Sequence, residues 1–151
     1  MPRLRFLFSA ALVLLLAACA QDSPTEPQLE GRMTGSLDGA AWSGGAWATL
    51  YRGTLVVGSM RDRNEQHVVL EVPFTGPGRY TAEAGKGRYY ETLGLDVLTY
   101  QAAATAGTLV VDTYDPASGE ITGTFQLAAQ GERGATRFEN GEFAARVFVA
   151  P

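Results

Sequence analysis

The chain has 151 residues, of which 46% are hydrophobic, and it carries a formal charge of −4 with one cysteine and one histidine. This acidic balance excludes ordinary nucleic-acid binding, which needs clustered basic side chains, so no nucleic-acid partner is expected. One cysteine excludes an intramolecular disulfide, and one histidine leaves too few ligands for a zinc site. No metal and no cofactor are therefore expected.

The first 18 residues predict a secretion signal. Arg3 and Arg5 precede the apolar run Phe6–Leu16, which is too short for a membrane span of about 20 residues. The stretch Leu16–Cys19 then resembles the lipobox of bacterial lipoproteins. The resemblance implies cleavage before Cys19, a thioether-linked diacylglycerol on its sulfur, and acylation of the new N-terminus. The alternative is an ordinary signal peptide with a chance cysteine.

Lipidation of Cys19 would place the protein in a bacterial cell envelope, anchored to the membrane by lipid. Ala20, rather than Asp, follows the cysteine, which resembles an outer-membrane address facing the periplasm or the cell surface. Removal of residues 1–18 takes away two arginines and no acid, which changes the formal charge to −6. Residues 19–30 are rich in proline and polar side chains, so they predict a flexible tether behind the lipidated cysteine.

Residues 31–151 predict a single all-β domain, because short apolar runs alternate with turn residues and no helical period appears. The alanine-rich residues 100–106 predict a loop or a strand continuation rather than a helix. The expected strands are Thr54–Met60, Gln66–Phe74, Tyr89–Tyr100, Thr108–Tyr114, Ile121–Leu127 and Phe143–Val149.

Turn residues separate these runs. The expected turns are Asp62–Glu65, Gly76–Gly78, Asp115–Gly119 and Gly131–Gly134, and Asn140-Gly141 predicts a bulge within the last strand. About eight strands joined by short loops favour an antiparallel meander that closes as a barrel or a β-sandwich, with a lipocalin-like topology among the options.

Several turn motifs resemble a known family. Phe74–Tyr80 resembles a "tGxY" pattern, and Tyr114–Phe125 followed by Asn140–Phe143 resembles "sGxixGtF … nGxF". Together with Leu37–Trp42, they are similar to a family of small bacterial lipoproteins known only as domains of unknown function. The resemblance implies an extracytoplasmic β-rich domain over most of residues 32–149 and supplies no catalytic residue.

Candidate catalytic and metal-binding groups all have ordinary structural explanations. The sequence has no G-x-S-x-G turn that could supply a serine nucleophile beside His67. We therefore expect His67 to be a half-exposed strand residue that faces solvent beside Glu65 or Glu71. The spacing of Asp115, Ser118 and Glu120 does not match the calcium-binding loop of an EF-hand. We expect these residues to form a turn that is stabilised by their side chains. The Gly85–Arg88 loop predicts a solvated hairpin tip. The acids Glu71, Glu91, Asp96 and Asp112 would catalyse glycoside hydrolysis only if two of them met across a cleft.

The aromatic residues are the strongest indication of a binding surface. We expect Trp42 and Tyr89 to lie in the core. Trp47, Tyr90 and Tyr100 form the candidate binding surface, because exposed aromatic rings suit contact with a sugar or a protein. On one regular strand Tyr90 and Tyr100 would share a face opposite Leu93, Leu95 and Val97.

These observations leave three functional hypotheses. The first is a lipid-anchored β-domain with a non-catalytic role in binding or envelope structure, whose partner is an envelope protein or a glycan. The second is a lipocalin-like carrier that holds a small apolar ligand inside a closed sheet. The third is a hydrolase that uses paired carboxylates.

Overall fold

The computed structural model describes residues 31–59, 65–93 and 97–150, and these residues form nine strands and no helix. No described segment is therefore a helix long and apolar enough to cross a membrane. The predicted signal, Cys19 and the tether lie outside the described residues. The strands are β1 (Arg32–Leu37), β2 (Ala40–Tyr51), β3 (Thr54–Ser59), β4 (Gln66–Pro73), β5 (Gly78–Ala82), β6 (Gly87–Leu93), β7 (Val97–Tyr114), β8 (Glu120–Gly131) and β9 (Gly134–Val149).

The strand pairings form a ring. Neighbours in the order β7-β6-β4-β3-β2-β1-β9-β8 are hydrogen-bonded, and β8 pairs again with β7. The first part of β7 pairs with β6 and its later part with β5, so β5 fills the edge that β6 leaves open. All pairs are antiparallel except a short parallel pairing of β2 with β9 over residues 48–50. This closed, all-β architecture confirms the predicted fold class.

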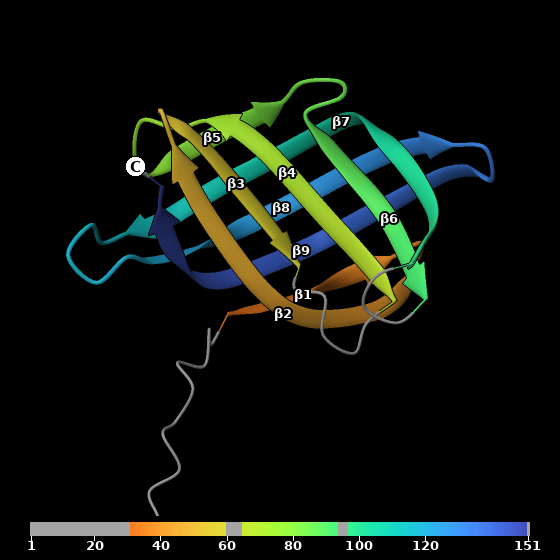
Figure 1. Ribbon diagram of the computed structural model, residues 1–151, viewed down its shortest axis with the longest axis horizontal. Helices are drawn as coiled ribbons and strands as arrows, with labels where there is room; N and C mark the ends of the chain where they lie inside the picture. The colour runs from red at the N-terminus through yellow and green to blue at the C-terminus, as the bar shows by residue number, and fades with distance from the viewer. Residues whose placement is uncertain (1–30, 60–64, 94–96, 151) are drawn as a thin grey trace, which may run out of the picture.

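The ring is folded into two layers. In Figure 1, β2, β3, β4 and β6 cross over β7, β8 and β9, and β1 runs along the lower edge. Tight turns join the first strands: Asp38-Gly39 and Arg52-Gly53 have positive φ at both residues, with values of 49°, 85°, 48° and 79°. A two-residue hairpin turn of type I′ requires this conformation, and glycine adopts it at little cost.

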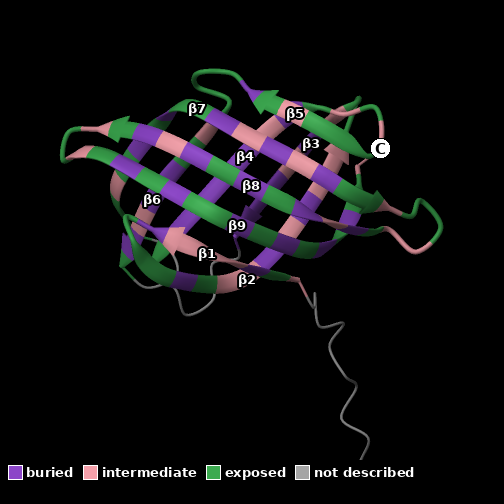
Figure 2. Ribbon diagram, turned by 180° about the vertical axis from the view of Figure 1, so that it is seen from behind, coloured by how far each residue is buried: buried purple, intermediate pink, exposed green. Residues whose placement is uncertain are grey.

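Alternating side chains fill the space between the layers. Figure 2 shows buried and exposed residues alternating along β8 and β9. Phe138 is 1% exposed and lies centrally, with its ring centroid 5.3 Å from Trp42, 5.9 Å from Tyr89 and 6.1 Å from Phe125. Small residues such as Ala102 and Ala104 on β7 leave room for these rings. Aromatic side chains therefore fill the interior of the closed sheet.

The predicted bulge lies within β9. The pairing of β9 with β8 shifts between Phe125 and Leu127, and Asn140 has a φ of 51°. A Cβ on Gly141 would come within 2.5 Å of the Phe125 ring, and one on Gly123 would come within 2.7 Å of the Phe143 ring. Gly123 and Gly141 therefore each accommodate a phenylalanine of the other strand.

One expected strand needs correction. Tyr89–Tyr100 is two strands and not one, because β6 ends at Leu93, β7 begins at Val97, and these two residues pair across the strands. A short hairpin keeps the apolar alternation in phase, so the pattern did not reveal the reversal. The predicted break at residues 76–78 is confirmed, because β4 ends at Pro73 and β5 begins at Gly78, and the nine strands agree with the predicted count of about eight. The strand continuation over residues 100–106 is confirmed within β7.

Candidate functional site

A pocket of about 330 Å³ opens at one end of the closed sheet, and we call it the end pocket. It lies where the β1–β2 turn, the start of β4, the end of β6, the start of β7 and the β8–β9 turn meet. Its lining residues are Leu37, Asp38, Ala40, Ala41, Trp42, Gln66, Tyr89, Glu91, Tyr100, Arg133 and Thr136. Aromatic walls with a few converging polar groups are typical of ligand sites.

Two residues that line the end pocket each bury a polar atom without a partner among the described residues. Trp42 Nε1 and Tyr100 Oη have no hydrogen-bond partner within the described part of the chain. Trp42 is 8% exposed, and its ring packs edge-on against Phe138. An indole N–H can only donate, and a buried donor without an acceptor costs free energy. Folded proteins rarely keep such groups unless a ligand or water satisfies them.

A charged pair lies beside these atoms. Arg133 Nη1 donates to Glu91 Oε2 at 2.8 Å, and Tyr89 Oη donates to Glu91 Oε1 at 2.8 Å. Burial, and then the bond and charge of Glu91, raise the pKa of the Tyr89 hydroxyl well above its ordinary value. Tyr89 is therefore a neutral donor at physiological pH, and the carboxylate of Glu91 is held from two sides.

The position of Tyr100 depends on the strand register. Tyr100 pairs with Glu91 across β6 and β7, so both side chains lie on the inner face. The guanidinium carbon of Arg133 lies 4.5 Å from the centre of the Tyr100 ring. A Cβ on Gly131 would come within 2.2 Å of Tyr100 Oη, so the glycine admits the hydroxyl at this place. The β8–β9 hairpin therefore both receives and covers the ring.

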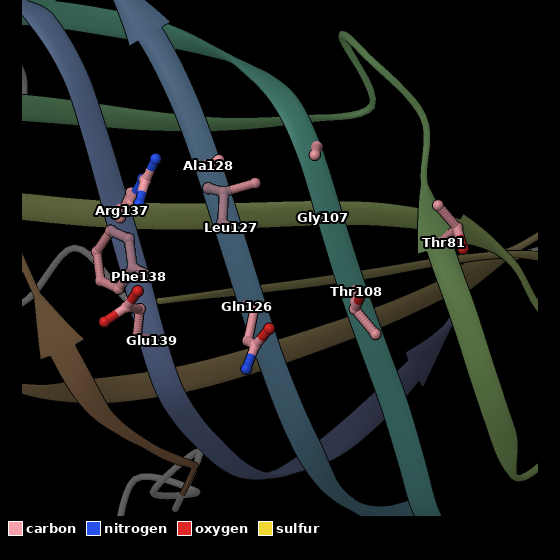
Figure 3. A pocket seen from close by; sticks show the side chains of 10 residues that line it. Thr81, Gly107, Thr108, Gln126, Leu127, Ala128, Arg137, Phe138 and Glu139 are labelled. Carbon is pink, nitrogen blue, oxygen red and sulfur yellow. The ribbon is translucent and has the colours of Figure 1, made fainter.

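Other hollows are present besides the end pocket, and one of them, the outer hollow, lies on the outer surface of the sheet. Figure 3 shows this hollow of about 300 Å³, which crosses β5, β7, β8 and β9. Thr81, Gln126, Arg137 and Glu139 on its rim are exposed, so water satisfies their polar groups. No buried donor or acceptor without a partner borders this hollow in the described residues. The end pocket is therefore the stronger candidate for a ligand site.

The structure does not bring the three predicted surface aromatics together. Tyr90 and Tyr100 lie on opposite faces, because Tyr90 pairs with Gln101 while Tyr100 pairs with Glu91. Tyr90 is 5% exposed, so the expected exposed ring is wrong for this residue. Trp47 is half-buried on the outer face of β2, packed against Gly58, and its Nε1 donates to Ser59 O at 2.9 Å. Of the three, Tyr100 alone borders the end pocket.

His67 is fully buried rather than half-exposed. Its ring stacks on Tyr90, directly opposite on β6, with the centroids 4.7 Å apart. Its Nε2 lies 3.1 Å from Thr92 Oγ1. The alternation placed His67 on the correct, outer face of β4. The alternation could not show how exposed His67 is, because the Tyr90 ring on β6 covers the imidazole.

Trp42 and Tyr89 are core residues, as predicted. Among the acids, Glu71 pairs with Lys86 at 3.0 Å, Glu91 pairs with Arg133, and Asp96 lies outside the described residues. The pair with Glu71 accounts for one of the two cations of the Gly85–Arg88 loop, and the guanidinium carbon of the other, Arg88, lies 5.7 Å from the centre of the Tyr90 ring.

Side chains hold the Asp115–Gly119 turn, as predicted. Asp115 Oδ1 accepts from Ala117 N at 2.9 Å, and Oδ2 accepts from Ser118 Oγ at 2.8 Å. Both bonds lower the pKa of the Asp115 carboxyl, and the bond from the Ala117 backbone has the larger effect. Among the described residues, no group of three or more His, Cys, Asp or Glu side chains is arranged to hold a metal ion.

Sequence reasoning missed the polar half of the end pocket. Glu91 was considered only as a catalytic acid, and Arg133 only as part of a turn. The alternation of Tyr89 with Glu91 could have placed both on the inner face. Nothing in the sequence brings Arg133 to Glu91, since the two residues are 42 positions apart.

Comparison with curated proteins and with solved structures gave no significant match. A family model covers residues 30–146, which include β1 to β8 and most of β9. The expectation of a family without assigned function is thereby confirmed: the chain belongs to the family described as domain of unknown function (DUF6252).

Proposed function

We propose that this protein is a lipid-anchored binding module of a bacterial envelope, without a catalytic role, that takes a small ligand in its end pocket. The observation that carries the binding role is that two residues lining one pocket each bury a polar atom, Trp42 Nε1 and Tyr100 Oη, that has no hydrogen-bond partner among the described residues. A ligand acceptor at this place would remove the cost of burying them.

The lipid anchor is supported by the lipobox-like stretch ending at Cys19 and by the polar tether behind it. Two or three acyl chains hold a protein on a bilayer durably, whereas a single chain binds only marginally. The domain would then extend into the aqueous space of the envelope, with the outer membrane as the expected address.

The carrier hypothesis differs in where the ligand lies. A small apolar molecule inside the sheet would have to displace Phe138 or its ring neighbours Trp42, Tyr89 and Phe125. Close-packed interiors resist such displacement, so the end pocket is favoured over the interior of the closed sheet as the ligand site.

Acyl labelling tests the anchor. In a bacterial host fed labelled palmitate, the wild-type protein should carry label and sediment with membranes. Cys19→Ser should lose the label and keep residues 1–18, because the sulfur is the acceptor of the lipid. Ser23→Ala, in the tether, is the matched control and should behave as wild type. An unlabelled wild-type protein would refute the anchor.

A small-molecule fragment library tests binding. Fragments that bind should shift amide and indole signals of the end pocket in ¹H–¹⁵N spectra, with smaller shifts at the outer hollow. A library whose hits all map to the outer hollow, or that gives no hit, would refute the end pocket as the binding site.

A further inference from the structure

The end pocket supplies hydrogen-bond donors at its base and both donors and acceptors at its rim. Trp42 Nε1 only donates, Tyr100 Oη can donate and accept, and both are buried without a partner in the described residues. At the rim, the carboxylates of Asp38 and Glu91 accept, while Arg133 donates. A matching ligand must therefore carry acceptors for the base together with donors for the rim.

The charges of the pocket select against anions. Glu91 and Arg133 neutralise each other at 2.8 Å, which leaves the carboxylate of Asp38 as the unbalanced charge of the lining. Asp38 Oδ1 also accepts from Arg137 N at 2.7 Å, which fixes this carboxylate at the rim. A second negative charge in the pocket would be repelled, so a neutral ligand fits better than an acidic one.

Size and wall chemistry narrow the class further. A volume of about 330 Å³ is at the lower end of the range for ligand sites, so the ligand is small. The rings of Trp42, Tyr89 and Tyr100 offer apolar walls between the polar groups. Hydroxyl groups donate and accept at once, and the C–H faces of a sugar ring suit aromatic walls.

We propose that the end pocket binds a neutral, hydroxyl-rich small molecule of the monosaccharide class, an inference that rests on the proposed binding role. The exposed Arg133 side chain lies over the Tyr100 ring and spans to Glu91. It covers the Tyr100 ring in the ligand-free protein and moves aside when the ligand enters. Trp42 Nε1 and Tyr100 Oη then donate to oxygen atoms of the sugar.

The indole signals of the two tryptophans give a direct test. The protein, purified from cells in a detergent without sugar headgroups, is titrated with glucose, galactose and N-acetylglucosamine. The Trp42 indole signal should shift saturably with at least one of these sugars. The Trp47 indole already donates to Ser59 O at 2.9 Å and should stay in place as the internal control. Trp47→Phe assigns the two signals.

Two comparisons sharpen the result. Glucuronate should bind at least about ten-fold more weakly than the neutral sugar, because it adds a charge beside Asp38. Tyr100→Phe, which removes only the hydroxyl, should weaken sugar binding about five-fold, the loss of one hydrogen bond. Tyr51→Phe, at the exposed end of β2, should leave the affinity unchanged.

The outcomes separate this inference from the broader binding role. If only glucuronate or inorganic phosphate shifts the Trp42 signal, the neutral-sugar class is wrong and the binding module stands. If no sugar and no anion shifts it, the sugar inference falls, and the fragment library described above decides the binding role separately. Equal affinity of Tyr100→Phe and the wild type would also overturn the assigned role of the hydroxyl.

Discussion

Removal of the Tyr100 hydroxyl should stabilise the ligand-free protein. Its Oη is buried without a partner in the described residues, and such a group costs about 1–3 kcal/mol. Tyr100→Phe removes that cost and leaves a void of one oxygen atom, which gives back roughly half a kcal/mol. The free energy of unfolding should therefore rise by about 0.5–2 kcal/mol. This gain corresponds to roughly 2–8 °C in melting temperature for a domain of this size.

The same substitution at Tyr80 is the matched control and should have the opposite sign. Tyr80 Oη accepts from Thr75 N at 3.2 Å and donates to Gly76 O, so Tyr80→Phe breaks bonds that exist. It should lower the free energy of unfolding by about 0.5–1.5 kcal/mol. Urea denaturation of both variants beside the wild type measures the two changes. A destabilised Tyr100→Phe would show that the hydroxyl already has a partner, and the argument for a ligand acceptor would fail.

Two further predictions concern the charged side of the end pocket. Because the fold raises the pKa of the Tyr89 hydroxyl, this group's contribution to stability is complete below pH 10, the ordinary tyrosine value, and is lost as the pH rises above that value. The urea midpoint should therefore fall more steeply from about pH 9 to about pH 11 for the wild type than for Tyr89→Phe. Equal slopes for the two proteins would contradict this prediction. Arg133→Ala should lower the free energy of unfolding by less than about 1 kcal/mol, since the Arg133 side chain is 59% exposed and its pair with Glu91 is screened by water; a larger loss in the same urea assay would show a structural role.

Much of the fold could be read from the alternation of apolar residues, because each strand has one inward face. The runs in β4, β8 and β9 gave both the strands and their buried sides, and Asn140-Gly141 gave the bulge. The β6–β7 hairpin was missed because the residues on both sides of the turn keep the same period. The closure of the ring depends on pairs far apart in sequence, such as β1 with β9, which no local pattern encodes.

The candidate site was harder to predict for the same reason. Sequence reasoning selected Tyr100 as an aromatic of interest but placed it on an exposed platform with Tyr90. Its inward direction follows from the register shift between Glu91 and Thr92, because the Leu93–Val97 pairing continued without that shift would place Tyr100 opposite Tyr90. Arg133 enters the site from a different hairpin, so its contact with Glu91 is a product of ring closure. Residue type suggested the chemistry, and the topology decided which residues meet.

The motifs that carry the family resemblance have a structural explanation. In the register of β8 and β9, Gly123 pairs with Phe143 and Phe125 pairs with Gly141. Each phenylalanine ring lies over the glycine of the other strand, so these residues form two reciprocal glycine–phenylalanine pairs. A ring over a cross-strand glycine fills the space that the missing side chain leaves and fixes the register. The "GtF … nGxF" pattern therefore specifies the packing of these strands, while Trp42, Tyr100 and Arg133 form the pocket.

The reciprocal pairs predict a strong and coupled response to an added methyl group. A Cβ at position 141 would lie 2.6 Å from Phe125 O as well as 2.5 Å from its ring, so backbone as well as side chain must move. Gly141→Ala should therefore lower the free energy of unfolding by about 2–3 kcal/mol in urea denaturation. Phe125→Leu in the same chain should relieve part of that loss, so the double variant should be less destabilised than the sum of the two single changes. Additive changes would show that the ring and the glycine act independently. The motif would then need an explanation other than strand packing.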